Sequence, residues 1–240
     1  MLGIGLATSG HAQLVRIAAG DFTPQASVIT FNNTGETNPV YDVATATLGT
    51  VTVSFGSNFA GQTVSAGFPA SLTGSPTGPL TLLNDATVFV TPDGANPTSP
   101  VLSGTPRFNG PISVFFSVPV AAVGLDGGYF DAVKSTSIEA FSADGASLGI
   151  VTNTKTGIEF FGLADASGKN VISGISFYIT GPEPAGFGID NLTFGSAREL
   201  TKPPPGMTPI PEPSTYAAFA SVGLILLIVR RFHRRNAANA

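Results

Sequence analysis

The sequence lacks cysteine and tryptophan entirely, and only two of its 240 residues are histidine. Without cysteine the chain can form no disulfide bond or thiolate metal site, and it has no cysteine nucleophile. The two histidines, His11 and His233, lie near the two ends of the chain. The long segment between them has no histidine, so it can form no Ser-His-Asp or Cys-His nucleophilic system and no histidine zinc site.

Charge is also scarce and unevenly distributed. Residues 13–200 carry 14 acidic and 6 basic side chains, whereas residues 230–240 carry four arginines and no acid. An acidic segment is a poor partner for nucleic acid, whose binding depends on neutralising phosphates, so we expect no nucleic-acid partner. A basic cluster that directly follows an apolar run is typical of the cytoplasmic side of a membrane.

The residues that are abundant favour strands over helices. The chain has 29 Gly and 18 Phe, and Thr, Ser and Val are frequent. In residues 50–56 the side chains of Val51, Val53 and Phe55 alternate with Thr52 and Ser54, which is the two-residue period of a half-buried strand. Residues 136–153 predict a β-hairpin that reverses at Asp144-Gly145.

Further strands are predicted at intervals along the main segment. The first clear one is "ASVITFNN", and residues 110–128 hold two more about Pro119, which we expect on an edge or at a bulge. At least ten candidate strands precede residue 214, and no helical period does. The sequence thus predicts an all-β fold, an antiparallel β-sandwich or barrel over residues 13–200. Without disulfide bonds it is stabilised by its own core or by an oxygen-ligated ion such as calcium.

The N-terminus has the layout of the later part of a secretory signal peptide. Residues 1–12 contain a short apolar stretch, with Gly10 and Ala12 at positions −3 and −1 of a cut before Gln13. We predict that residues 1–12 are a signal peptide, shortened because the start codon was assigned too far downstream. The alternative is a flexible terminus or an edge strand.

A Pro-rich linker, residues 201–213, separates the main segment from an apolar run at Tyr216–Val229. As a helix these 14 residues reach about 21 Å, short of a bilayer core of about 30 Å. Residues 213–215 and the arginine stems extend the reach. We therefore predict one transmembrane helix with an Arg-rich tail over residues 214–235, the tail in the cytoplasm.

The order of Pro211-Glu212-Pro213, apolar helix and Arg230, Arg231, Arg234 and Arg235 resembles the PEP-CTERM sorting domain, over residues 210–235. The resemblance implies export in a Gram-negative bacterium and transient anchoring in the inner membrane. It also implies processing by an exosortase, which places the protein on the cell surface or in an exopolysaccharide matrix. Pro211, Glu212 and Pro213 are then recognition residues, and the four arginines set the membrane topology.

A second resemblance covers residues 110–195. This segment, which closes on "GIDNLTFG", is similar to the jelly-roll ectodomains common in PEP-CTERM proteins. Those sandwiches are similar to carbohydrate-binding modules. The resemblance implies a jelly-roll-like sandwich.

Catalytic chemistry has few candidates in this segment. Paired carboxylates hydrolyse glycosidic bonds, but Asp126, Asp131, Glu139 and Asp144 form no locally marked pair and are typical of turns and solvated surface. The sequence "GLADASGKN" is one residue too long for a phosphate-binding loop and lacks its Ser or Thr. We predict that the protein is not an enzyme.

Two weaker binding sites are suggested by residue type. Asp126, Asp190 and Asn191 offer oxygen ligands for calcium, the one cofactor considered; the alternative is an Asx turn that closes a strand. Tyr129, in the loop "DGGYFDA", could stack on a sugar as an exposed ring, or be a half-buried core residue.

The main prediction is an exported, non-enzymatic surface or exopolysaccharide-matrix protein, with an exosortase and the membrane as partners. The first alternative is a carbohydrate-binding module on the same sandwich, with polysaccharide as partner. The second is a polysaccharide-active hydrolase.

Overall fold

The computed structural model describes residues 14–202, and in this range the regular structure is almost entirely β. Two short 3-10 helices, η1 (Ala19–Asp21) and η2 (Ala197–Glu199), are the helical elements described. No helix among residues 14–202 is long and apolar enough to cross a membrane. The predicted signal peptide, transmembrane helix and sorting signal lie outside the described residues.

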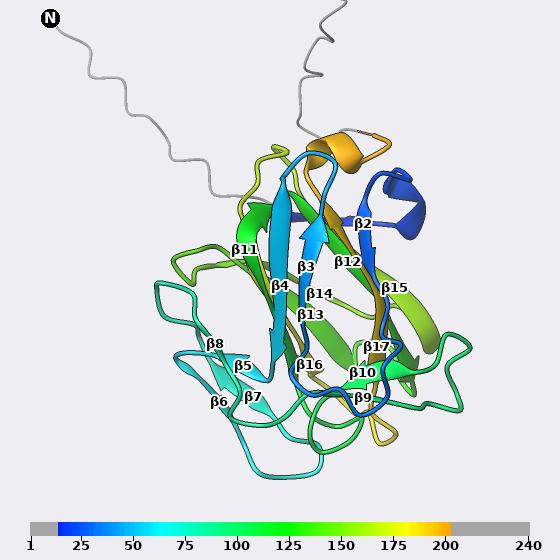
Figure 1. Cartoon of the computed structure of the whole chain (residues 1–240). Coiled ribbons are helices and arrows are strands. Elements are labelled where there is room, and N and C mark those ends of the chain that lie inside the picture. Colours follow the sequence, from blue (N-terminus) through cyan, green and yellow to red (C-terminus); the bar gives the residue numbers. More distant parts are fainter. Residues whose placement is uncertain (1–13, 203–240) are drawn as a thin grey trace, which may run out of the picture. The chain divides into compact units, whose positions relative to one another are not determined.

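Two antiparallel sheets form a sandwich, which confirms the all-β, antiparallel part of the predicted fold (Figure 1). In the larger sheet the strand order is β1-β15-β12-β17-β10-β9, and β2 also pairs with β17. Its seven strands are β1 (Leu14–Ile17), β2 (Ser27–Ile29), β9 (Phe89–Thr91), β10 (Val101–Ser103), β12 (Ala122–Phe130), β15 (Gly157–Asp165) and β17 (Gly188–Gly195).

The second sheet has six strands in the order β14-β13-β16-β11-β4-β3. They are β3 (Val40–Ala44), β4 (Thr50–Gly56), β11 (Ile112–Val120), β13 (Thr136–Phe141), β14 (Ser147–Thr152) and β16 (Ile172–Ile179). Two small two-stranded sheets lie beside it, formed by β5 (Asn58–Phe59) with β8 (Leu82–Leu83) and by β6 (Gln62–Val64) with β7 (Leu72–Gly74).

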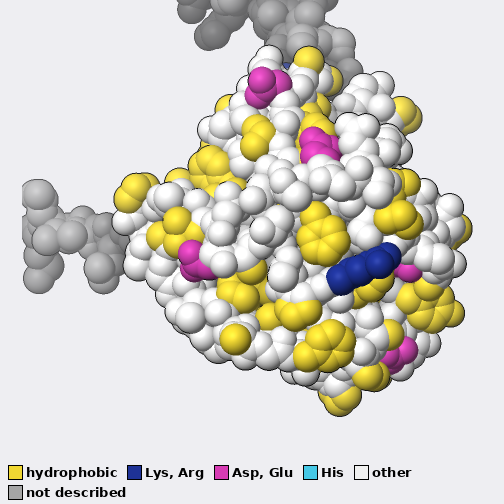
Figure 2. Space-filling model, turned by 60° about the horizontal axis from the view of Figure 1, so that its bottom comes forward, with side chains coloured by type: hydrophobic (Ala, Val, Ile, Leu, Met, Phe, Trp, Pro, Cys, Tyr) yellow, Lys and Arg dark blue, Asp and Glu magenta, His cyan; other side chains and the backbone are white. Residues whose placement is uncertain are grey.

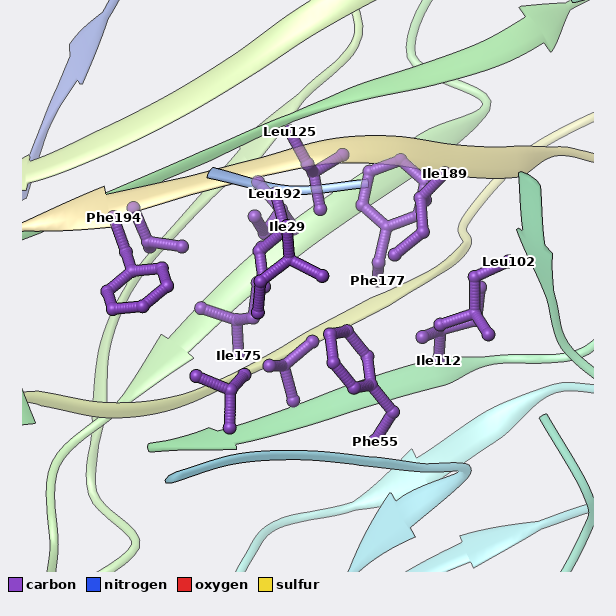
Figure 3. Close-up of a cluster of buried hydrophobic side chains, with 14 of the residues drawn as sticks. Ile29, Phe55, Leu102, Ile112, Leu125, Ile175, Phe177, Ile189, Leu192 and Phe194 are labelled. Atoms are coloured by element: carbon purple, nitrogen blue, oxygen red, sulfur yellow. The ribbon is translucent and has the colours of Figure 1, made fainter. Parts of the chain in front are cut away.

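The core fills the space between the two large sheets (Figure 3). Val51, Val53 and Phe55 of β4 are buried, as their alternation predicts. Phe177 of β16 packs edge-on against Phe187, with 4.7 Å between ring centroids. Burial of apolar surface on this scale is the main stabilising contribution to a domain that has no disulfide bonds.

Several local predictions are tested by the register of the strands. The hairpin at residues 136–153 is present as β13 and β14, and Gly145 in its turn has φ +81°. Pro119 lies where the pairing of β11 with β16 shifts between Phe115 and Val120, so it occupies a bulge. The strand predicted at "ASVITFNN" is present as β2, and a further strand that was not predicted, β1, precedes it and pairs with β15. The tetrapeptide of β1 was too short to be recognised by its period.

The two ends of the sandwich differ in what they hold. At one end Ala122 pairs with Gly195, and at the other Gly128 pairs with Gly188. The first, which we call the terminal end, carries β1 and η2 (Figure 1). There the backbone nitrogen of Thr201 donates to the carbonyl of Asp21 at 2.7 Å, so the beginning and the end of the described chain are held together.

Candidate binding site

An open depression of about 110 Å³ lies at the opposite end, where β12 ends and β17 begins. We call this end the aromatic end and the depression the aromatic pocket; its lining includes Asp93, Phe108, Tyr129 and Gly186. Figure 2 views the molecule from this side and shows hydrophobic side chains spread over the face, with Lys or Arg coloured dark blue among them.

Tyr129 is the most exposed aromatic side chain of the pocket, with 51% of its surface accessible. Of the two interpretations of Tyr129, the structure therefore favours the exposed ring over the core residue. Its ring lies beside Gly157, where a Cβ atom would come 3.6 Å from the tyrosine Cζ. The backbone of β15 thus supports the ring while much of the ring stays open to solvent.

Phe108 is held in the pocket wall by an unusual backbone conformation. Its φ of +62° lies in the left-handed region, which a bulky side chain rarely adopts. The backbone nitrogen of Phe108 donates to Ser103 Oγ at 2.7 Å, and its carbonyl oxygen accepts from Phe187 N at 2.6 Å. A Cβ atom on Gly186 would lie 1.9 Å from that carbonyl oxygen, so only glycine fits there. The surrounding contacts therefore impose the strained conformation.

Two charged side chains adjoin the aromatic rings. The guanidinium carbon of Arg107 lies 4.7 Å from the centroid of the Phe108 ring, a cation–π geometry, and the same group donates to the carbonyl of Pro92. Asp93 lines the pocket, and its Oδ1 accepts from Ala95 N at 2.9 Å, which fixes the carboxylate. The pocket therefore combines apolar rings with one oriented acceptor and a neighbouring donor.

A buried glutamate holds the loops below the pocket. Glu183 accepts from Asp131 N at 2.8 Å and from the hydroxyl of Ser135, while Asp131 accepts from Ala185 N at 2.9 Å. Burial raises the pKa of Glu183 above its ordinary value, although the hydrogen bond from Ser135 acts in the opposite direction. These bonds tie the loop after β16 to the end of β12.

The three calcium candidates are brought together on neighbouring strands. Asp126 and Asp190 are directly paired between β12 and β17, and Asn191 Nδ2 donates to Asp126 Oδ2 at 2.8 Å. Asp190 Oδ1 accepts from the backbone nitrogens of Asn191 and Phe31, and burial raises the pKa of its carboxyl. The strand continues past them, so the expected Asx turn at a strand end is wrong: the register shifts here in mid-strand, and Asn191 has φ +50°.

Calcium at this place stays a prediction. The ion takes about six to eight oxygen ligands, whereas Asn191 turns its NH₂ group toward Asp126. Within residues 14–202 no group of three or more His, Cys, Asp or Glu side chains is arranged to hold a metal ion.

The other candidate acids have structural partners. Glu139 accepts from the Ser147 hydroxyl at 2.6 Å and from Tyr178 Oη at 3.0 Å. Asp144 accepts from the Ser142 hydroxyl, and this hydrogen bond lowers its pKa. Glu139 and Asp144 also line a second hollow, of about 340 Å³, beside the turn of the β13–β14 hairpin. Their positions are those of turn and hairpin residues.

Sequence reasoning missed Asp93, Arg107 and Phe108. They come from two loops that pattern analysis treats as connections, and the structure joins these loops to Tyr129 from β12. The local signal was an aromatic and a basic residue together in the Pro- and Gly-rich segment 104–111, a composition that marks a loop rather than a core strand.

No protein family and no curated protein matches this sequence. Among solved structures, the chain is similar to the enzymatically active domain of tailspike protein 4 from bacteriophage CBA120, at 14% identity and a TM-score of 0.26. The similarity covers 75% of this chain and 21% of the tailspike chain, so the match spans about a fifth of that structure. A likeness this low supports no statement about function.

Proposed function

We propose that the protein is an exported, non-enzymatic protein of the cell surface or exopolysaccharide matrix of a Gram-negative bacterium, sorted through its C-terminal segment. The supporting observation is where the sandwich ends. Its last described backbone hydrogen bond is that of Thr201 to Asp21, at the start of the Pro-rich linker that leads to Pro211-Glu212-Pro213. The sandwich is thus complete before the sorting segment begins, so it can stay folded after that segment is removed.

The proposal gives the segments separate tasks. Residues 1–12 direct export, residues 13–200 form a jelly-roll-like ectodomain, and residues 214–235 anchor the chain until an exosortase acts at residues 210–213. The chain crosses from one sheet to the other between consecutive strands, from β12 to β13 and from β15 to β16. Such crossings suit a jelly-roll-like arrangement. The non-enzymatic role is supported by Glu139 and Asp144, whose carboxylates already bond to neighbouring side chains.

The processing step is tested by intact-mass spectrometry of the full chain produced with and without an exosortase. We expect loss of the segment after Pro213 only when the exosortase is present, and retention of Ala240 in the Glu212→Gln variant under the same conditions. The ectodomain variant Glu36→Gln serves as the matched control and should be processed normally. A wild-type chain that still ends at Ala240 beside an active exosortase would contradict the proposal.

A further inference from the structure

We propose that the aromatic pocket binds a hexopyranose ring of a neutral polysaccharide, with Tyr129 as the stacking platform. This rests on the proposed function, because it names the matrix component that an exported ectodomain would hold. A pyranose has an apolar C–H face and a rim of hydroxyl groups. A site for it needs an exposed aromatic ring beside fixed hydrogen-bonding groups.

The aromatic side of the site is formed by two rings at its rim. Tyr129 is half exposed and supported from behind by the backbone at Gly157, so a flat ligand can lie against it without displacing a side chain. Phe108 lines the same depression from the loop between β10 and β11. Aromatic side chains supply much contact area at little entropic cost. The pocket's volume, about 110 Å³, is well below the 300 Å³ or so at which enclosed ligand pockets begin, so it suits one ring of a longer chain lying on the surface.

The polar side of the site fits hydroxyl groups. Asp93 uses Oδ1 to accept from Ala95 N, and its second carboxylate oxygen can accept from a sugar hydroxyl. Arg107 does not line the pocket itself but lies over the Phe108 ring, where it directs part of its guanidinium to Pro92 and has further N–H donors. An acceptor and a donor beside a stacking ring are the pair of contacts that orient a sugar.

Charge decides between neutral and acidic polysaccharides. The segment 13–200 has 14 acidic and 6 basic residues, and Asp93 lies in the pocket itself. A polyuronate would meet the net negative charge of this segment and Asp93 in the pocket, which outweigh the neighbouring Arg107, whereas a neutral glycan carries no such penalty. The ligand class is therefore a neutral polysaccharide.

The site is formed before any ligand arrives. Phe108 is held at φ +62° by hydrogen bonds at its nitrogen and its carbonyl, and Gly186 allows the two loops to approach this closely. Glu183 fixes the loop that carries Gly186 to the end of β12. A rigid site avoids the entropic cost of ordering loops on binding, which matters for a ligand that offers few contacts.

Its place in the fold also suits the task. The aromatic end lies opposite the terminal end, where Thr201 leads into the linker (Figure 1). The pocket is consequently far from the attachment of the chain and accessible to a long polymer.

Binding can be measured by affinity electrophoresis and calorimetry, with the ectodomain attached to its natural linker. The probes are soluble β-1,3-glucan, β-1,4-glucan and galactomannan, with alginate as the acidic polymer. We expect retardation by at least one neutral polymer and none by alginate. Tyr129→Ala should weaken that binding at least tenfold, and Asp93→Asn severalfold.

Phe68→Ala is the matched control, because Phe68 is an exposed aromatic residue, 69% accessible, that does not line the pocket. It should bind as the wild type does. Equal losses in Phe68→Ala and Tyr129→Ala, preference for alginate, or no binding to any of the neutral polymers would each overturn the proposal. Because processing at residues 210–213 is read by mass and not by binding, either proposal can fail while the other stands.

Discussion

A buried glutamate organises each end of the sandwich, yet the two ends differ in what they leave exposed. At the terminal end Glu199 accepts from Ser196 N at 2.6 Å and from the Thr47 hydroxyl at 2.7 Å, and Leu200 closes a small apolar cluster. At the aromatic end Glu183 ties loops in the same manner, but Tyr129 above it stays open. A buried glutamate can thus fix the loops at an end of the sandwich whether or not the aromatic side chains there are covered. The stability of the fold therefore does not require the Tyr129 ring to be exposed.

The largest effect that tests this difference between the two ends is expected when one buried aromatic ring is removed beneath the aromatic end. Phe177 contacts Phe187, which lines the aromatic pocket. Phe177→Ala should reduce the free energy of unfolding by about 3–5 kcal/mol, because a buried ring leaves a cavity. Urea denaturation followed by circular dichroism measures the loss.

Phe116→Ala provides the counterpart, since Phe116 packs on Phe194 toward the terminal end. We expect a similar loss of stability, but only Phe177→Ala should also weaken polysaccharide binding at temperatures where both variants are folded. If both variants weakened binding equally, the two ends would not be independent.

A smaller effect is expected from Glu199→Ala. The substitution leaves the buried nitrogen of Ser196 without an acceptor, which costs about 1–3 kcal/mol. Amide chemical shifts should change around Thr47 and Ser196 and remain constant around Tyr129. Shifts that spread to Tyr129 would show that the terminal end controls the pocket.

The smallest effect concerns pH. Burial raises the folded-state pKa of Glu183 above its unfolded value, so the folded state retains this proton more strongly. Glu183 therefore favours folding most below its unfolded pKa of about 4.3. This contribution is lost as the pH rises through the folded-state pKa. Relative to Glu183→Gln, the wild type should be more stable near pH 4 than at pH 7.

Urea denaturation of both proteins between pH 3.5 and pH 7, in steps of about half a pH unit, measures that difference. Parallel stability profiles would show that Glu183 does not titrate as its burial implies.

The sequence indicated the sandwich well because its strands carry period-two patterns. Val51, Val53 and Phe55 alternate with polar neighbours, and the hairpin turn at Asp144-Gly145 is local. These features depend on residues close together in the chain, which pattern analysis detects. The pairing of strands far apart, such as β1 with β15, leaves no such local pattern.

The candidate site was predictable only in part. Tyr129 was identified as a candidate exposed ring, but the predicted loop around it is wrong, because Tyr129 belongs to the end of β12. Asp126, Asp190 and Asn191 proved to be neighbours across two strands. The position of Phe108 in the aromatic pocket depends on the hydrogen bond between its carbonyl and Phe187 N, which joins loops distant in sequence. This contact holds the backbone of a bulky residue in the left-handed region. No propensity predicts that conformation, because it is imposed by tertiary structure.

The position of Thr201 also determines how the protein would carry mechanical load. If a polymer pulls at the aromatic end while the linker resists beyond Thr201, the tension runs along β12 and β17, which extend from one end to the other. Hydrogen bonds between antiparallel strands lie across the strand direction, so this tension shears them together and does not open them one after another. The sandwich would then resist tension most strongly along the line from the aromatic end to the terminal end.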